Sequence, residues 1–94
     1  MKTIKNLAQL KRALKAGHHF MIVDHIRKEC IGEERKPTKV QTNTFYSANV
    51  NASQEEIDKI NGGLGAWLDF GKASDWKFEN GLCTLKGVWT IQII

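Results

Sequence analysis

Apolar side chains recur at two different spacings along the chain, and the change of spacing separates one helix from a series of strands. Between residues 3 and 16 they come every three or four positions, which places four of them on one helix face: Ile4, Leu7, Leu10 and Leu14. Thr3 is the expected N-cap, and Gly17 stands where a left-handed residue would end the helix. The spacing therefore predicts an amphipathic helix over residues 3–16.

Residues 19–27 alternate instead, as the residues of a strand do. One face carries Phe20, Ile22 and Ile26, and the other carries Met21, Val23 and His25. Because both faces are apolar over part of the length, we expect a central strand that is covered on both sides. Asp24 interrupts the first face and would need a partner if it were buried.

The middle of the chain indicates a loop, a strand and a short helix. Residues 28–39 are polar and charged and hold the only proline, Pro37, so we expect a loop or a ragged strand end. Residues 40–50 alternate and predict a half-buried strand, antiparallel to the first. Ser53 begins a capping box, which predicts a short helix over residues 54–61.

The dipeptide Asn80-Gly81 is the strongest local signal, because both positions accept positive φ and favour a two-residue hairpin turn. Counting outward from this turn places four residues on one face, which we expect to be the core face: Trp76, Phe78, Cys83 and Leu85. Residues 88–94 then form a last strand.

Together these patterns predict one α+β domain over residues 1–94. We expect an antiparallel sheet of four to five strands, with the N-terminal amphipathic helix on one face and the second short helix nearby. The length of 94 residues leaves no room for two cores. An apolar share of 41% and a charged share of 26% are typical of a globular rather than a disordered chain.

Composition favours a cytoplasmic protein that does not act at a membrane. No apolar run approaches the roughly 18 residues that span a bilayer, and no apolar segment follows the basic N-terminus as a signal peptide would require. A secreted domain of this size usually carries more than two cysteines. We therefore expect Cys30 and Cys83 to be free thiols.

The net charge of +4 is concentrated in one element. Residues 1–16 hold five basic side chains, Lys2 among them, and no acidic one, whereas the rest of the chain is nearly balanced. A localised basic face can bind phosphates or an acidic protein surface. The predicted partner-binding residues are Lys5, Lys11, Arg12 and Lys15. The alternative is a solvated helix face, since cations near a helix C-terminus also favour the helix dipole.

His25 and Cys30 are candidate ligands of a structural zinc ion. The polar segment after residue 26 can fold back and bring the two side chains together, with Glu29, Glu33 or another histidine completing the shell. The spacing is not that of a zinc finger, and His19 lies about 20 Å from His25 along a straight strand. The alternative is that the histidines lie at the surface and at the sheet edge without a metal.

No catalytic motif is recognisable, so we expect a protein that is not an enzyme. A set of Cys30, His25 and Asp24 would need a hydrogen-bonded pair of Asp24 and His25, but neighbours on a strand point to opposite faces and cannot form it. Nucleic-acid binding is the other open class. The basic helix could follow a phosphate backbone, but the second basic cluster, over residues 27–39, is interleaved with acids.

Two blocks of the sequence resemble small phage proteins. They are residues 25–29 (HIRKE), continuing at 40–47 (VQTNTFYS), and residues 65–76 (GAWLDFGKASDW). Together they are similar to small proteins of unassigned role that phages, prophages and conjugative elements of Gram-positive bacteria carry. Some small proteins of that setting are anti-CRISPR proteins, which bind a Cas nuclease and block its DNA loading or cleavage, and a few carry a structural zinc.

The resemblance implies a phage-encoded inhibitor that acts in the cytoplasm of a bacterial host on a type II Cas nuclease (Cas9). It implies no particular functional residue. Many inhibitors of this nuclease imitate DNA with an acidic surface, whereas this chain is basic. We therefore expect inhibition by contact between protein surfaces, with a nucleic-acid-binding accessory protein of a mobile element as the alternative.

Overall fold

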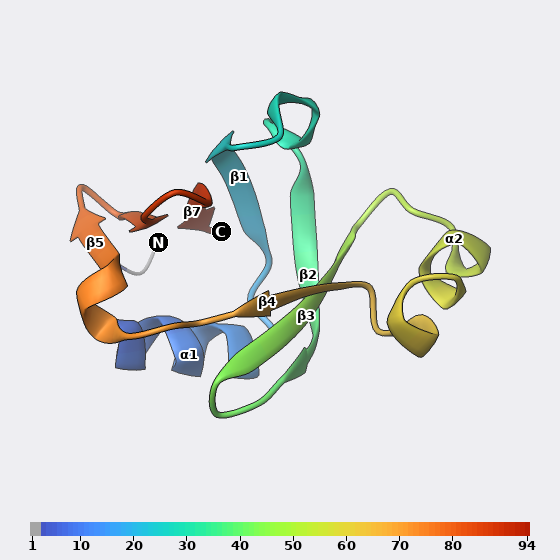
Figure 1. The fold of residues 1–94 in the computed structure, drawn as a ribbon, viewed down its shortest axis with the longest axis horizontal. Coiled ribbons are helices and arrows are strands. Elements are labelled where there is room, and N and C mark those ends of the chain that lie inside the picture. Colours follow the sequence, from blue (N-terminus) through green and yellow to red (C-terminus); the bar gives the residue numbers. More distant parts are fainter. Residues whose placement is uncertain (1–2) are drawn as a thin grey trace.

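The computed structural model describes residues 3–94, which form one antiparallel sheet with two α-helices (Figure 1). The helices are α1 (Leu7–Lys15) and α2 (Gln54–Asp58). The strands are β1 (Phe20–His25), β2 (Glu34–Val40), β3 (Thr44–Asn49), β4 (Ala66–Asp69), β5 (Trp76–Glu79), β6 (Leu82–Leu85) and β7 (Trp89–Ile93). Three 3-10 turns are η1 (Lys28–Cys30), η2 (Asn61–Gly63) and η3 (Ala73–Asp75). No helix within these residues has the length and apolar character needed to cross a bilayer.

The α+β class and the antiparallel sheet are confirmed, but the sheet has seven strands rather than four to five, in the order β4-β3-β2-β1-β7-β6-β5. Much of the difference lies in residues 34–50, where a loop or ragged strand end followed by one strand over residues 40–50 was predicted and two strands are present instead. β2 ends at Val40 and β3 begins at Thr44. The Gln41 N–H donates to the Thr44 carbonyl oxygen over 2.8 Å and closes a hairpin between them.

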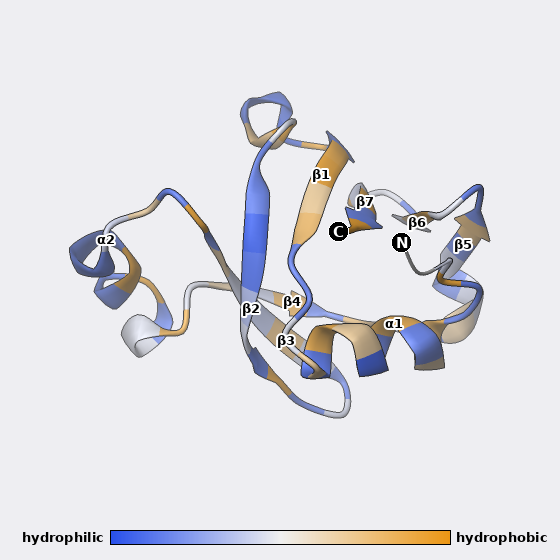
Figure 2. Cartoon of the chain, turned by 180° about the vertical axis from the view of Figure 1, so that it is seen from behind, coloured by the Kyte–Doolittle hydropathy of each residue, from blue (hydrophilic) through white to orange (hydrophobic). Residues whose placement is uncertain are grey.

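β2 is a strand despite its charges and its proline. It pairs with β3 over most of its length but with β1 only through Glu34 and Arg35. Pro37 lies where the register with β3 shifts, a position that tolerates a missing N–H. Because β1 and β2 diverge beyond these pairs, the polar side chains of β2 do not need to be buried. Figure 2 shows the hydrophilic β2 beside the hydrophobic β1.

The helix α1 begins later than predicted and ends as predicted. Its N-cap is Asn6 rather than Thr3, because the Asn6 side chain accepts a hydrogen bond from the Gln9 N–H over 2.9 Å. At the other end Gly17 has φ +92°, and its N–H donates to the Leu14 carbonyl oxygen. The His18 N–H donates to the Ala13 carbonyl oxygen, which completes a Schellman motif.

A bulge at Val23 changes the faces of β1. Ile22 pairs with Ile91 of β7, but the next pair is Asp24 with Thr90, so Val23 is an extra residue. His25 then pairs with Trp89 and shares the core face, rather than lying with Met21 and Val23 as the alternation predicted. Strict counting is wrong here because one inserted residue exchanges the two faces.

The sheet curls around α1 and a cluster of aromatic rings. β3 and β7 are not neighbours in the sheet, yet the ring centroids of Phe45 and Trp89 lie 5.9 Å apart. Phe20 packs edge-on against both rings, and Phe45 stacks on Phe70 with centroids 4.8 Å apart. The helix lies across the end of this curved sheet (Figure 1) and buries its apolar face: Leu7, Leu10, Ala13 and Leu14. The core is therefore one continuous unit.

The C-terminal hairpin has the predicted register. Asn80 and Gly81 have φ values of 53° and 77°, and the strands pair Phe78 with Cys83 and Trp76 with Leu85. Cys83 is a free thiol with no exposed surface, and burial raises its pKa to about 11. Cys30 is also a free, buried thiol, as expected.

The segment between β3 and β4 contains α2, which is shorter than predicted and ends at Asp58. The predicted cap is confirmed, since the Ser53 hydroxyl oxygen accepts from the Glu56 N–H. Gly65 has φ +88°, and a Cβ there would collide with the Ser47 carbonyl oxygen. This glycine allows the backbone entering β4 to approach β3 closely.

Candidate functional site

The structure forms a cleft of about 340 Å³ on the core face of the sheet, beside β4. Its two sides come from distant parts of the sequence. One side is formed by β3 and β4, and the other by the end of β1, the η1 turn and the start of β7. The polar side chains that line it are His25, Arg27, Cys30, Arg35 and Ser47. Both predicted zinc ligands, His25 and Cys30, therefore reach one cavity.

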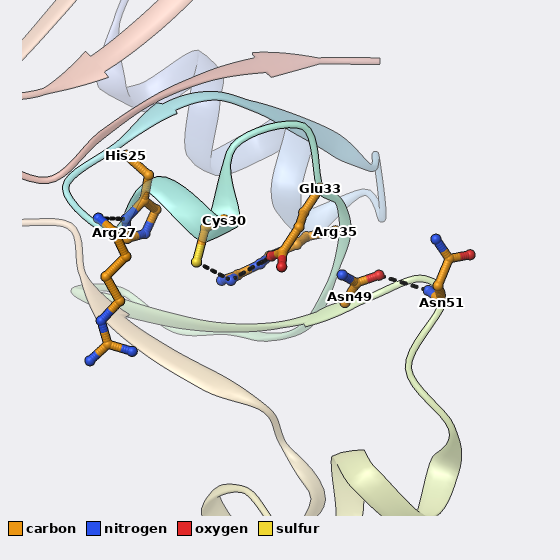
Figure 3. A network of polar contacts seen from close by, with 7 residues as sticks. All are labelled: His25, Arg27, Cys30, Glu33, Arg35, Asn49 and Asn51. Carbon is orange, nitrogen blue, oxygen red and sulfur yellow. Dashed lines mark hydrogen bonds and ion pairs between the residues drawn. The ribbon is translucent and has the colours of Figure 1, made fainter.

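Arg35 is the central cation of the cleft. It pairs with Phe20 of β1 and with Asn49 of β3, and its side chain is only 14% exposed. The guanidinium donates to the Glu33 carboxylate through Nη2 and Nε, at 2.9 and 3.1 Å (Figure 3). Its Nη2 also lies 3.7 Å from Cys30 Sγ. The arginine thus joins the η1 turn to the sheet and carries its own counterion.

His25 is held in one tautomer by the backbone. The Arg27 N–H donates to its Nδ1 over 2.8 Å (Figure 3), so in the neutral ring the proton is on Nε2. The ring also packs edge-on against Trp89, with centroids 5.9 Å apart. Burial lowers the pKa of His25, and the nearby charges of Arg35 and Arg27 lower it further, against smaller opposing effects of Glu33 and Glu29. The imidazole is therefore neutral at physiological pH.

The cleft brings together two of the predicted zinc ligands, His25 and Cys30, but not, from the described part of the chain, the further ligands that a structural zinc ion needs. No three His, Cys, Asp or Glu side chains come together within residues 3–94. A metal on Nε2 would need Nδ1 to carry the proton, but Nδ1 already accepts the Arg27 N–H. The Arg35 guanidinium next to Sγ adds a positive charge beside the second ligand. Zinc at His25 and Cys30 remains a prediction.

The other histidines lie elsewhere. His19 Nδ1 contacts the Glu34 carboxylate over 2.8 Å at the start of β1, and His18 is exposed after α1. The carboxylate of Asp24 does not face the cleft, since this residue pairs with Thr90 on the opposite face of the sheet from His25. It accepts the His25 N–H and lies 3.6 Å from Lys28 Nζ. No Asp–His–Cys relay is formed among these residues.

Three of the four predicted residues of the basic face, Lys11, Arg12 and Lys15, lie on α1, Lys5 precedes the helix, and one of the four is engaged. Lys11 Nζ donates to the Thr42 carbonyl oxygen over 2.8 Å and lies 5.1 Å from the centroid of Phe70. Lys5, Arg12 and Lys15 are exposed. Within residues 3–94 none of the four forms an ion pair with a carboxylate. Lys2, which belongs to the same predicted basic segment, lies outside the described residues.

A shallow groove of about 300 Å³ runs between α1 and the turn that joins β2 to β3. Lys11, Arg12 and Lys15 form its helical side, and Val40, Gln41 and Thr42 form the opposite side. Since Lys11 is fixed by Thr42, the mobile charges at this groove are those of Arg12 and Lys15. The groove is a place where an acidic group could be held between the helix and the turn.

Sequence reasoning placed Arg35 only in the basic cluster of residues 27–39, and it could not show that Trp67, which is 53% exposed on β4, stays at the surface. Their segments were expected to be a loop and a short apolar stretch, so neither residue could be assigned to a sheet face. The structure thus has two candidate binding surfaces, the cleft beside β4 and the basic face of α1. No protein-family model, curated protein or solved structure matches the chain.

Proposed function

We propose that the chain is a non-enzymatic binding protein whose basic α1 face contacts an acidic surface of a bacterial defence protein, a type II Cas nuclease. In this proposal it acts in the cytoplasm of a phage-infected host and blocks DNA loading or cleavage. The resemblance of residues 25–29, 40–47 and 65–76 to small phage proteins supports the setting. The contact itself is supported by the unpaired charges of α1.

The single observation that carries the contact is the absence of carboxylate partners for Lys5, Arg12 and Lys15 within residues 3–94. Four other lysine and arginine side chains in this part of the chain lie within 4 Å of an acid. Exposed unpaired cations on one element create a local positive potential, which steers an acidic partner and raises the association rate. A basic face is also inconsistent with imitation of DNA, so contact at a protein surface is the proposed route.

The cleft supports the non-enzymatic part of the proposal. A nucleophilic Cys30 would need an adjacent base, but its sulfur lies 3.7 Å from Nη2 of the Arg35 guanidinium, which is a donor and not a base. Nδ1 of His25 is already occupied by the Arg27 N–H. The thiol is also only 9% exposed. The contacts of His25, Cys30 and Arg35 therefore fit a structural role, in which they hold the η1 turn against the sheet.

The test is a pull-down with purified Cas9 together with a DNA-cleavage assay. We expect the wild-type protein to be retained and to inhibit cleavage, and the double variant Arg12→Glu/Lys15→Glu to lose both properties. Lys86→Glu is the matched control, because Lys86 is exposed on the turn before β7 and has no carboxylate partner within residues 3–94. No retention of the wild type, with undiminished cleavage, removes the proposed partner.

The second candidate function is binding of nucleic acid, and the groove at Arg12 and Lys15 favours it. Phosphate contacts release counterions, so the affinity for DNA or RNA would fall steeply as salt is raised. A titration at several salt concentrations separates the two functions. Affinity that falls steeply with salt and is lost in Arg12→Glu/Lys15→Glu would favour nucleic acid over a protein partner.

A further inference from the structure

The backbone of β4 offers hydrogen-bonding groups that no other strand within residues 3–94 uses. β4 is the last strand of the sheet on its side, and it pairs only with β3. The Phe70 N–H donates to the Asn43 carbonyl oxygen over 2.8 Å, which fixes the alternation of the antiparallel ladder. Leu68 and Ala66 therefore exchange hydrogen bonds with β3, and the N–H and C=O groups of Trp67 and Asp69 point away from it.

Side-chain directions at this edge follow from the same register. Leu68 pairs with the buried Phe45, so Leu68 and Ala66 lie on the core face, toward the cleft. Trp67 pairs with Tyr46, so its side chain projects from the opposite face and is exposed, while the residue also lines the cleft at the strand edge. A strand added to this edge would place alternate side chains over the cleft and over the indole of Trp67.

The charge of the cleft selects one kind of side chain. Two arginines line it, Arg27 and Arg35, and no acidic residue does. Arg35 is already neutralised by Glu33. Arg27 is exposed, and it forms no ion pair with a carboxylate within residues 3–94; its side chain extends away from the network around Arg35 (Figure 3). Arg27 is thus the free cation beside the open edge.

We propose that an extended segment of a partner protein adds to the sheet along β4, outside Trp67 and Asp69. The segment carries an acidic side chain over the cleft, where it meets Arg27, and an apolar side chain on the other face, where it packs on Trp67. Main-chain hydrogen bonds supply affinity in this mode, and alternate side chains supply specificity. The site is separate from the basic face of α1 and does not depend on the function proposed for that face.

The test uses a synthetic peptide and amide hydrogen exchange followed by NMR. The probe is an acetylated nonapeptide in which valine and glutamate alternate, and its control has lysine in place of glutamate. We expect the glutamate peptide to slow exchange of the Trp67 and Asp69 amides by about tenfold or more, and to leave Ala66 and Leu68 unchanged. If millimolar glutamate peptide changes no amide of residues 66–69, the proposal is overturned.

Two variants separate the backbone contribution from the charge contribution. Trp67→Pro removes the outward N–H and Trp67→Thr keeps it, so binding should be lost in the first and only weakened in the second. Arg27→Glu leaves β4 untouched and should reverse the preference between the two peptides, with about fivefold weaker binding of the glutamate peptide. The Arg27 variant keeps the proposal testable if the proline variant does not fold.

A second copy of the chain is the competing occupant of this edge. Protection of Trp67 and Asp69 that appears without peptide, and grows with protein concentration, would replace the partner segment by self-association. Equal binding of the glutamate and lysine peptides would overturn the role of Arg27. The α1 variant Arg12→Glu/Lys15→Glu should bind the glutamate peptide like wild type, which keeps this test independent of the Cas nuclease experiment.

Discussion

The two edge strands of the sheet, β4 and β5, are protected to different degrees against pairing with a further strand. On β5 the side chains of Lys77 and Glu79 flank the exposed backbone groups of Phe78 and form an ion pair of 3.1 Å. On β4 the exposed backbone groups belong to Trp67 and Asp69 themselves, and the side chains of these residues lie on the same outer face of the sheet as Lys77 and Glu79. The Asp69 carboxylate is turned back to accept the Gly71 N–H over 2.7 Å. Charged side chains discourage strand addition, whereas an exposed indole favours it. The comparison indicates one edge that avoids partners and one that can accept them.

The edges also differ in what lies beneath them. Trp76 anchors β5 through stacking on Phe78, with centroids 5.9 Å apart, and through its Nε1, which donates to the Phe70 carbonyl oxygen over 2.7 Å. β4 has an open cleft beneath it instead. The packed residues beneath β5 leave no space for the side chains of an added strand. The open cleft beneath β4 leaves space for them.

Phe45→Ala should have the largest effect, because Phe45 pairs with Leu68 of β4 from the neighbouring strand β3, is fully buried and contacts the rings of Phe20, Phe70 and Trp89. We expect a loss of about 3–5 kcal/mol in the free energy of unfolding. Both edges depend on one core, so tryptophan fluorescence and far-UV circular dichroism should report the same midpoint in urea. Separate transitions would show that the β4 side and the β5 side are independent units.

Arg35→Met should have the next largest effect, since it leaves the mostly buried Glu33 carboxylate without its partner. We expect a loss of about 1–2 kcal/mol in a urea titration, discounted for the part of the pair that water reaches. Lys77→Met on β5 is the matched control, because its ion pair is exposed, and it should cost less than about 0.5 kcal/mol. Equal losses in the two variants would contradict the structural role given to Arg35.

Removing the charges of β5 should make the two edges alike. In Lys77→Val/Glu79→Val we expect concentration-dependent dimers or larger species in size-exclusion chromatography, because the edge becomes apolar and β-prone. Lys86→Val makes a similar change away from the edge and should stay monomeric at the same concentration. A monomeric double variant would show that charge does not protect β5.

The smallest effect concerns pH and His25. Its pKa is lowered in the folded protein, chiefly by burial and then by Arg35 and Arg27, so below about pH 6.5 the unfolded chain binds the proton more readily. Stability should therefore decrease as the pH falls below this value. His25→Asn keeps an acceptor for the Arg27 N–H and should have a flatter dependence in urea titrations from pH 7 to 5. An unchanged slope would show that other groups cause it.

Sequence reasoning was most successful where local chemistry decides the structure. The Asn80-Gly81 turn fixes the register of β5 and β6, and α1 ends just before Gly17, which adopts the positive φ that terminates a helix. It was wrong where tertiary pairing decides. β2 can carry charged side chains because β1 pairs with only two of its residues, Glu34 and Arg35. No sequence pattern predicts that the two strands separate beyond these pairs.

The same reason explains what was missed at the candidate sites. The bulge at Val23 moves His25 to the core face, and only the pairing with β7 reveals it. His25 and Cys30 were brought into one cleft as expected, but Arg35 was assigned to a loop. The basic face of α1 was predictable from periodicity, whereas the engagement of Lys11 by Thr42 depends on a contact across 31 residues.

The most direct test of the open β4 edge is amide hydrogen exchange in the protein alone, measured residue by residue over positions 66–69. The structure predicts alternation, with slow exchange at Ala66 and Leu68, which bond to β3, and fast exchange at Trp67 and Asp69, which face outward. Uniform protection of all four amides at low protein concentration would mean that the edge is already covered, and would contradict strand addition along β4.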